Sequence, residues 1–187
     1  TNFLAGSTVT LSTGGGSRII GDTRTINNYG NLNWSSGTNS LLFANSVQFN
    51  NYGTFNITTN ASFGLNGTPV APAFNNTSTG ILTNAGAFIV TMPGIALNNS
   101  GVVSVNDGTL RLSATTFTNF GTIQIAAGKA LDLLNTTTNL NGNTSITGSG
   151  ILSLSGGTTN IQFLVQIPSG VTVNFSSGVI QGVNTMR

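Results

Sequence analysis

A nine-residue pattern, in which an apolar residue, Asn, Gly and two further apolar residues alternate with variable positions, occurs five times in this chain. Apolar residues two apart are typical of strands with one buried face. An Asn and a Gly at fixed offsets indicate that the chain makes the same bend each time. A unit that recurs in this way predicts a solenoid of stacked coils. The five copies cover Ile26–Trp34, Phe49–Ile57, Leu82–Val90, Leu97–Val105 and Phe117–Ile125.

The spacing of the five glycines gives the length of a coil. Gly30 and Gly53 are 23 residues apart, and Gly101 and Gly121 are 20 apart. Gly86 lies 33 residues after Gly53 and 15 before Gly101, so these two intervals together correspond to two coils of about 24 residues. The irregular division predicts a coil with a loop excursion in this region.

We therefore expect residues 1–187 to form one all-β domain, a single-stranded right-handed parallel β-helix of about eight or nine coils with 20–24 residues each. An antiparallel sandwich is the alternative, but hairpins give no reason for the same Asn at the same offset in each repeat. The expected parts are regular Asn-x-Gly coils over 26–135, an irregular coil with a loop excursion near 66–95, and looser coils over 140–183.

Within the pattern, each Asn is separated from the apolar residues by an even number of positions. Side chains two residues apart in a strand point to the same side, so the asparagines are expected to point into the core. A buried amide without partners costs about 1–3 kcal/mol, whereas identical amides stacked along an axis donate to and accept from one another. The glycines two residues later are expected to supply the left-handed or otherwise forbidden geometry of the bend. The predicted structural ladder comprises Asn28, Asn51, Asn84, Asn99 and Asn119 with Gly30, Gly53, Gly86, Gly101 and Gly121.

The residues at the variable positions between these are expected to point outward. Tyr29 and Tyr52 then stack in adjacent coils, beside Asn27 and Asn50. Exposed aromatic pairs can bind a sugar ring or contact another fibre. The alternative is a stacked pair that only shields the ladder.

One ion pair follows from the same register. The strand Leu110–Leu112 aligns with Leu131–Leu133, which places Arg111 beside Asp132 on neighbouring coils. A surface pair of this kind is worth about 0–1 kcal/mol, so it tests the register of the coils and is not a site.

Charged residues make up only 4% of the chain, and the net charge is +2. No cluster of Lys and Arg is present, which argues against nucleic-acid binding. Asp22, Asp107 and Asp132 are the only acids, and His and Cys are absent. Paired carboxylates for glycoside hydrolysis, the acidic ligands of a calcium site, a zinc site and a catalytic triad all need more such groups. We expect no enzyme activity, no metal and no cofactor.

A polar β-rich surface with few charges is poorly protected against self-association. It suits a secreted protein that assembles or lies within a fibre. Ten Asn-x-Ser/Thr sequences would allow glycosylation, although the high content of Asn, Ser and Thr nearly explains their number. The longest apolar stretch, Ala87–Leu97, is interrupted by Pro93 and Gly94 and is too short for a membrane span.

Ice binding is another function that β-solenoids serve without charged residues. It would need a flat face with a Thr-x-Thr pair at one offset in successive coils. Thr8-x-Thr10 and the run Thr136–Thr138 do not recur at such an offset, so ice binding ranks below the other functions.

The segments Phe117–Leu133 and Phe49–Ile57 resemble the β-strand repeats of large bacterial secreted proteins, among them filamentous-haemagglutinin-like adhesins and autotransporter passenger domains. The resemblance covers residues 20–135 and extends loosely over the remainder. It implies export to the cell surface or beyond, and adhesive or fibre-forming roles.

The expected function is that of a non-catalytic extracellular structural or adhesive solenoid. Residues 1–11 and 171–183 are expected to be strands that pair head-to-tail with another copy or with adjacent repeats of a longer chain. The alternative is a carbohydrate-binding module that holds surface polysaccharide at Tyr29 and Tyr52.

Overall fold

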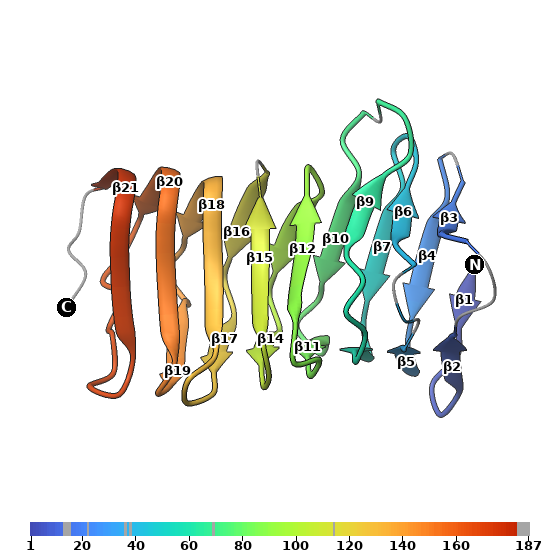
Figure 1. The fold of residues 1–187 in the computed structure, drawn as a ribbon, viewed down its shortest axis with the longest axis horizontal. Helices are drawn as coiled ribbons and strands as arrows, with labels where there is room; N and C mark the ends of the chain where they lie inside the picture. The colour runs from blue at the N-terminus through green and yellow to red at the C-terminus, as the bar shows by residue number, and fades with distance from the viewer. Residues whose placement is uncertain are drawn as a thin grey trace.

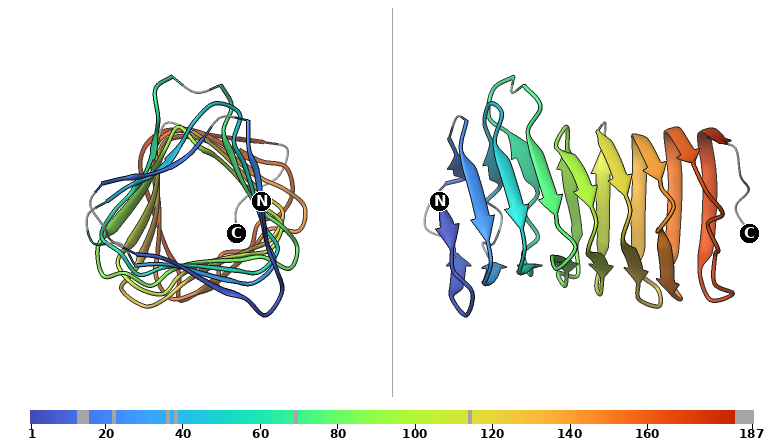
Figure 2. Two further views of the ribbon diagram at one scale, coloured as in Figure 1. Left: turned by 90° about the vertical axis from the view of Figure 1, so that its right-hand side faces the viewer. Right: turned by 180° about the vertical axis from the view of Figure 1, so that it is seen from behind.

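The computed structural model describes residues 1–12, 16–21, 23–35, 37, 39–68, 70–113 and 115–182. Over these residues the chain is all-β, and its parallel sheets stack as a β-solenoid of about eight turns (Figure 1). The first and last strands, β1 and β21, lie at opposite ends of the rod. Seen along its axis, the rod is roughly three-sided (Figure 2). Since stacked strands lie about 4.8 Å apart, eight turns give a length of roughly 40 Å. The predicted fold class is confirmed.

Each turn contributes one strand to each of three faces, which we call face 1, face 2 and face 3 in chain order. The strands of face 1 pair in register from β1 to β18. They are β1 (Asn2–Phe3), β4 (Thr25–Asn28), β7 (Gln48–Asn51), β10 (Ala73–Asn76), β13 (Ala96–Asn99) and β16 (Thr116–Asn119), followed by the C-terminal halves of β18 (Ala130–Leu140), β20 (Ile151–Ile161) and β21 (Thr172–Gly182).

Face 2 is a seven-stranded parallel sheet that lies along the lower edge of the view in Figure 1. Its strands are β2 (Thr8–Leu11), β5 (Asn31–Trp34), β8 (Thr54–Ile57), β11 (Ile81–Asn84), β14 (Val102–Val105), β17 (Thr122–Ile125) and β19 (Ser145–Gly148).

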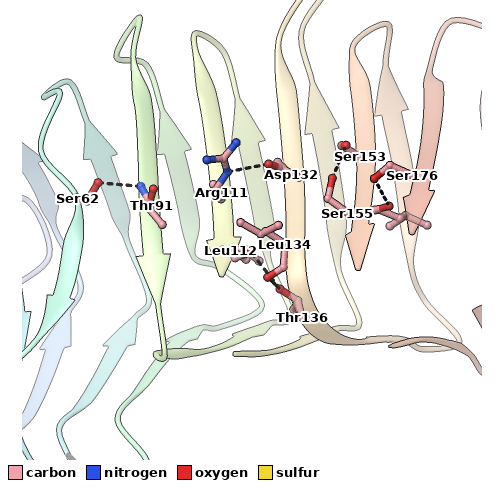
Figure 3. Close-up of polar contacts among 11 residues, drawn as sticks. Ser62, Thr91, Arg111, Leu112, Asp132, Leu134, Thr136, Ser153, Ser155 and Ser176 are labelled. Atoms are coloured by element: carbon pink, nitrogen blue, oxygen red, sulfur yellow. Dashed lines mark hydrogen bonds and ion pairs between the residues drawn. The ribbon is translucent and has the colours of Figure 1, made fainter. Parts of the chain in front are cut away.

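Face 3 is interrupted between its third and fourth strands. At the break, the backbone nitrogen of Thr91 donates to Oγ of Ser62 over 3.0 Å, in place of a regular ladder bond (Figure 3). The strands are β3 (Arg18–Ile20), β6 (Leu41–Phe43) and β9 (Phe63–Leu65) before the break, and β12 (Ile89–Pro93), β15 (Thr109–Ser113) and the N-terminal halves of β18, β20 and β21 after it.

Alternate residues of the strands fill one continuous apolar core. In the N-terminal half this core is aromatic, and the rings of Phe49 and Phe74 stack with their centroids 5.0 Å apart. In the C-terminal half it is mainly aliphatic, with Leu110, Ile123 and Leu131 fully buried beside Phe117. This arrangement follows from the alternation of apolar and polar residues in the sequence, because successive side chains of a strand point to opposite faces.

The coils differ in length. From Asn28 to Asn119, equivalent residues of successive coils on face 1 are 23, 25, 23 and 20 residues apart. The 25-residue coil from Asn51 to Asn76 contains the excursion between β9 and β10, which stands out from the wall in Figures 1 and 2. Its residue Val70 is 69% exposed. The excursion lies between the end of β9 at Leu65 and the start of β10 at Ala73.

The described non-glycine residues with a left-handed conformation lie at the corner between face 3 and face 1. Thr23, Ser46, Ala71 and Asn135 have φ values of 52°, 51°, 47° and 50° there. A non-glycine residue in this region costs about 1–2 kcal/mol, so the corner is held by the packing of the coils. None of the five predicted ladder glycines has a positive φ, and the expectation that they supply left-handed geometry is wrong.

Candidate functional site

Five buried asparagines form a hydrogen-bonded column on face 1, which we call the inner ladder. Nδ2 of each donates to Oδ1 of the next, and the four distances are 2.8, 2.8, 2.8 and 2.6 Å. Each side chain is at most 1% exposed. In the flanking coils Phe3 and Leu140 occupy the same position, so the column ends there. Its members are Asn28, Asn51, Asn76, Asn99 and Asn119.

Asn84 is not a member of this column, which corrects the prediction. It lies on β11 of face 2, in register with the core residues Ile57 and Val105. Its Nδ2 donates to the carbonyl of Asp107 over 2.9 Å, and its buried Oδ1 has no partner. The copy of the pattern at 82–90 matches by spacing alone, and its residue Phe88 is 59% exposed instead of pointing inward.

The glycines that accompany the inner ladder allow neighbouring coils to approach closely. A Cβ added to Gly53 would lie 2.1 Å from the carbonyl oxygen of Gly30, and one added to Gly121 would lie 2.1 Å from that of Gly101. The glycines also form a column, and Gly80 is its middle member. A Cβ added to Gly101 would lie 2.2 Å from the carbonyl oxygen of Gly80. Gly86 instead faces the carbonyl of Thr59 at another corner. The glycines are thus required by contact between coils.

A second column of amides, the outer ladder, runs along the exterior of face 1. Its side chains donate toward the N-terminal end, opposite to those of the inner ladder. Asn27 donates to Asn2, and Asn50 donates in turn to Asn27, over 2.8 and 2.9 Å. The bonds continue from Asn75 to Asn50 and Asn98 to Asn75, and resume from Asn139 to Thr118, Asn160 to Asn139 and Gln181 to Asn160.

The sequence prediction missed both Asn76 and the outer ladder, although a signal for them was present. The chain contains four Asn-Asn dipeptides, at 27–28, 50–51, 75–76 and 98–99. The first residue of each lies in the outer ladder and the second in the inner one. Gly80 follows Asn76 by four residues instead of two, and this insertion broke the nine-residue pattern.

The predicted tyrosine stack is present at the corner between face 1 and face 2. The ring centroids of Tyr29 and Tyr52 are 4.6 Å apart and their planes differ by 12°. The residues are 42% and 37% exposed. Asn27 and Asn50, expected beside them, hydrogen-bond to each other. Each ring covers one face of the other, so a ligand could reach each tyrosine only at its edge or its second face.

Two ion pairs join neighbouring coils on and near face 3. Nε of Arg111 lies 2.7 Å from Oδ2 of Asp132, as the register predicted (Figure 3). Nζ of Lys129 lies 2.5 Å from Oδ1 of Asp107. Hydrogen bonds from Lys129 and from the backbone of Gly108 hold the pKa of Asp107 below its usual value of 3.8.

Figure 3 shows the polar residues of face 3 spread along several coils. Thr136 Oγ1 donates to the carbonyl of Leu112 over 3.0 Å, and the hydroxyls of Ser153 and Ser155 are 3.0 Å apart. Within the described part of the chain, no three His, Cys, Asp or Glu side chains gather as a metal site would require. Asp22 lies outside the described residues.

The described residues include no helical segment with the length and hydropathy of a membrane span. A scan against protein-family models found no matching family, and searches of curated proteins and of solved structures found no match either. The function of the chain is therefore inferred from its geometry.

Proposed function

We propose that this chain is a non-catalytic structural or adhesive β-solenoid of the cell exterior, continued at its ends by further coils. Those coils belong to other copies stacked head-to-tail or to adjacent repeats of a longer surface fibre. The observation that carries the proposal is the exposure of core positions at both ends of the described solenoid.

At the C-terminal end, the last strand presents inward-facing side chains to solvent. Phe175 is in register with the buried Leu154, and Ile180 with the buried Thr159. Yet Phe175 is 52% exposed and Ile180 is 42% exposed. A further coil would bury both, at about 25 cal/mol per Å² of apolar surface removed from water.

The N-terminal end of the described solenoid also leaves core positions incompletely buried. Phe3, Val9, Leu11 and Ile20 occupy core positions but are only partly buried. Solenoids that exist alone close such ends with polar caps. Here the terminal coils also present open strand edges, which pair readily with other strands.

The chemistry of the described acids supports a role other than catalysis. Asp107 and Asp132 are each engaged by a cation from a neighbouring coil, and they lie at different positions in their coils, one in a turn and one in a strand. The resemblance to filamentous-haemagglutinin-like and autotransporter repeats also favours an exported fibre, and extracellular placement is part of the proposal.

Two adjacent residues of β21 provide a matched test. Ile180 faces the core, whereas Val179 is in register with Thr158 on the exterior and is 53% exposed. We expect the unmodified protein to associate with rising micromolar concentration in sedimentation velocity, and to show rods longer than one copy in electron micrographs. Ile180→Lys should prevent this, and Val179→Lys should not. A protein that stays monomeric would contradict assembly between copies.

A second candidate function is carbohydrate binding at the tyrosine corner, favoured by the exposed Tyr29–Tyr52 stack beside the Asn27–Asn50 amides. A glycan array should then lose its signal with the double variant Tyr29→Ala/Tyr52→Ala. Phe120→Ala is the control, because Phe120 follows the inner-ladder Asn119 just as the tyrosines follow theirs, and is 48% exposed. Equal signals from all three proteins would remove this function.

A further inference from the structure

Charge is distributed unevenly over the three faces. The described charged side chains lie on face 3 or at its corners: Arg18, Arg24, Asp107, Arg111, Lys129 and Asp132. The described strands of face 2 carry none, and neither do those of face 1. Face 2 differs from face 1 in how its outward side chains are bonded.

The register of face 2 places its outward side chains in two rows parallel to the rod axis. Nearly all are hydroxyl or amide groups, and Ile81 and Val102 are the apolar members. The first row is Thr8, Asn31, Thr54, Ile81, Val102, Thr122 and Ser145, and the second is Thr10, Asn33, Asn56, Thr83, Ser104, Gln124 and Thr147.

This register changes the interpretation of Thr8-x-Thr10. A pair of hydroxyl or amide side chains occupies the same two positions in the next two coils, as Asn31-x-Asn33 and Thr54-x-Asn56, and the coil after these has Ile81-x-Thr83. A search for Thr alone could not reveal the recurrence, because the two residue types share only their short, uncharged hydrogen-bonding side chains.

The six side chains of β2, β5 and β8 make few contacts within the protein. In the described part of the chain, the one hydrogen bond among them joins Asn56 to Asn33 over 3.5 Å. The amides of face 1, in contrast, are bonded to one another at about 2.8 Å. The donors and acceptors of this part of face 2 are therefore available to an external partner.

The spacing of these groups is regular in two directions. Neighbours along the axis are about 4.8 Å apart, and the two rows are about 6.6 Å apart. Each hydroxyl and amide can both donate and accept, as water does. A lattice of hydrogen-bonding groups with similar spacings is a partner that could match such an array. Charged side chains would hold water in a competing arrangement, and face 2 has none in its described strands.

We propose that the N-terminal half of face 2 binds ice, through Thr8, Thr10, Asn31, Asn33, Thr54 and Asn56. Crystalline polysaccharide is the nearest competing solid. No described aromatic side chain points outward from the strands of face 2 to stack on sugar rings. This binding is independent of the fibre role, because it uses a side of the rod and not its ends.

The test uses ice itself as the probe. The protein is labelled with a fluorophore, and its adsorption to a single growing ice crystal and its inhibition of ice recrystallisation are measured. Asn33→Lys, at the centre of the patch, should raise the concentration needed for inhibition at least tenfold. Thr137→Lys, an exposed position on face 1, is the matched control and should leave it unchanged.

Circular dichroism and thermal melting show whether each variant is folded. Thr8→Lys, on the exposed first strand of face 2, provides a second variant if Asn33→Lys fails to fold. Ile180→Lys should bind ice as the unmodified protein does, which separates this property from assembly. Exclusion of the unmodified protein from growing ice, or equal activity of the Asn33→Lys and Thr137→Lys proteins, would overturn the proposal.

Discussion

Nδ2 of Asn51 donates to Oδ1 of Asn76 over 2.8 Å, and this bond joins the two halves of the inner ladder. Asn76 donates in turn to Asn99 and to the carbonyl of Val102, over 2.8 and 2.9 Å. The whole side chain is 1% exposed. Removal of this amide therefore leaves buried partners on two sides.

We expect Asn76→Ala to lower the free energy of unfolding by about 2 kcal/mol, since an unsatisfied buried polar group costs about 1–3 kcal/mol. Asn84→Leu is the control, because it gives up one hydrogen bond, to the carbonyl of Asp107, but removes a buried oxygen without a partner and adds a side chain like those of Ile57 and Val105 beside it. Its effect should stay within about 1 kcal/mol. Urea denaturation measures both, and the reverse order would contradict the ladder as described.

Gly53 tests whether the glycines serve close approach or backbone freedom. A Cβ there would lie 2.1 Å from the carbonyl oxygen of Gly30, so Gly53→Ala should force the coils apart and cost roughly 2–3 kcal/mol. Gly67 has a φ of 77° and open space around it. Gly67→Ala should therefore cost only about 1 kcal/mol of strain. Thermal melting of the two variants compares them, and equal losses would favour backbone freedom at both positions.

The Arg111–Asp132 pair should respond unequally to loss of its two members. The Asp132 side chain is 11% exposed and that of Arg111 is 34% exposed. Arg111→Met leaves a nearly buried carboxylate without its partner and should cost roughly 1–2 kcal/mol, discounted for the access of solvent to the arginine. Asp132→Asn frees the arginine to turn toward water and should cost less. A double-mutant cycle in urea separates the pair from its surroundings, and an equal loss in both variants would contradict this asymmetry.

The Lys129–Asp107 pair gives a pH dependence of known sign. The pKa of Asp107 is lower in the folded protein than its usual value of 3.8, so the folded state holds the proton less tightly than the unfolded state. The stabilisation is complete above pH 3.8 and is lost as the pH falls through the lower folded value. Urea midpoints recorded from pH 6 to pH 2 should fall less steeply for Lys129→Met than for the unmodified protein. Parallel curves would show that the pair contributes nothing.

The sequence was sufficient for the fold because each coil repeats one apolar alternation, which specifies parallel strands with one buried face. It also placed Arg111 beside Asp132 and Tyr29 on Tyr52, since both pairs occupy equal positions in regular coils. The prediction failed where the length of a coil changes, because equal spacing in the sequence then no longer means equal position in the coil. The two extra residues between Asn76 and Gly80 moved the match to Asn84, one face away.

The left-handed bends and the polar rows of face 2 could not be predicted from the sequence pattern, each for its own reason. Left-handed conformations at Ser46 and Ala71 are imposed by the packing of neighbouring coils, and neither residue type favours them. The rows of face 2 become visible only when each strand is aligned with the next, because Thr and Asn alternate in them without a fixed order.

The opposed directions of the inner and outer ladders have an electrostatic consequence. Aligned amide dipoles sum along a column, as peptide dipoles do in an α-helix. On face 1, one column directs its N–H groups toward the C-terminal end and its neighbour directs them toward the N-terminal end. Wherever the two run side by side, their fields largely cancel. Adding coils to the two ladders therefore builds up little charge separation between the tips of the rod from these side chains.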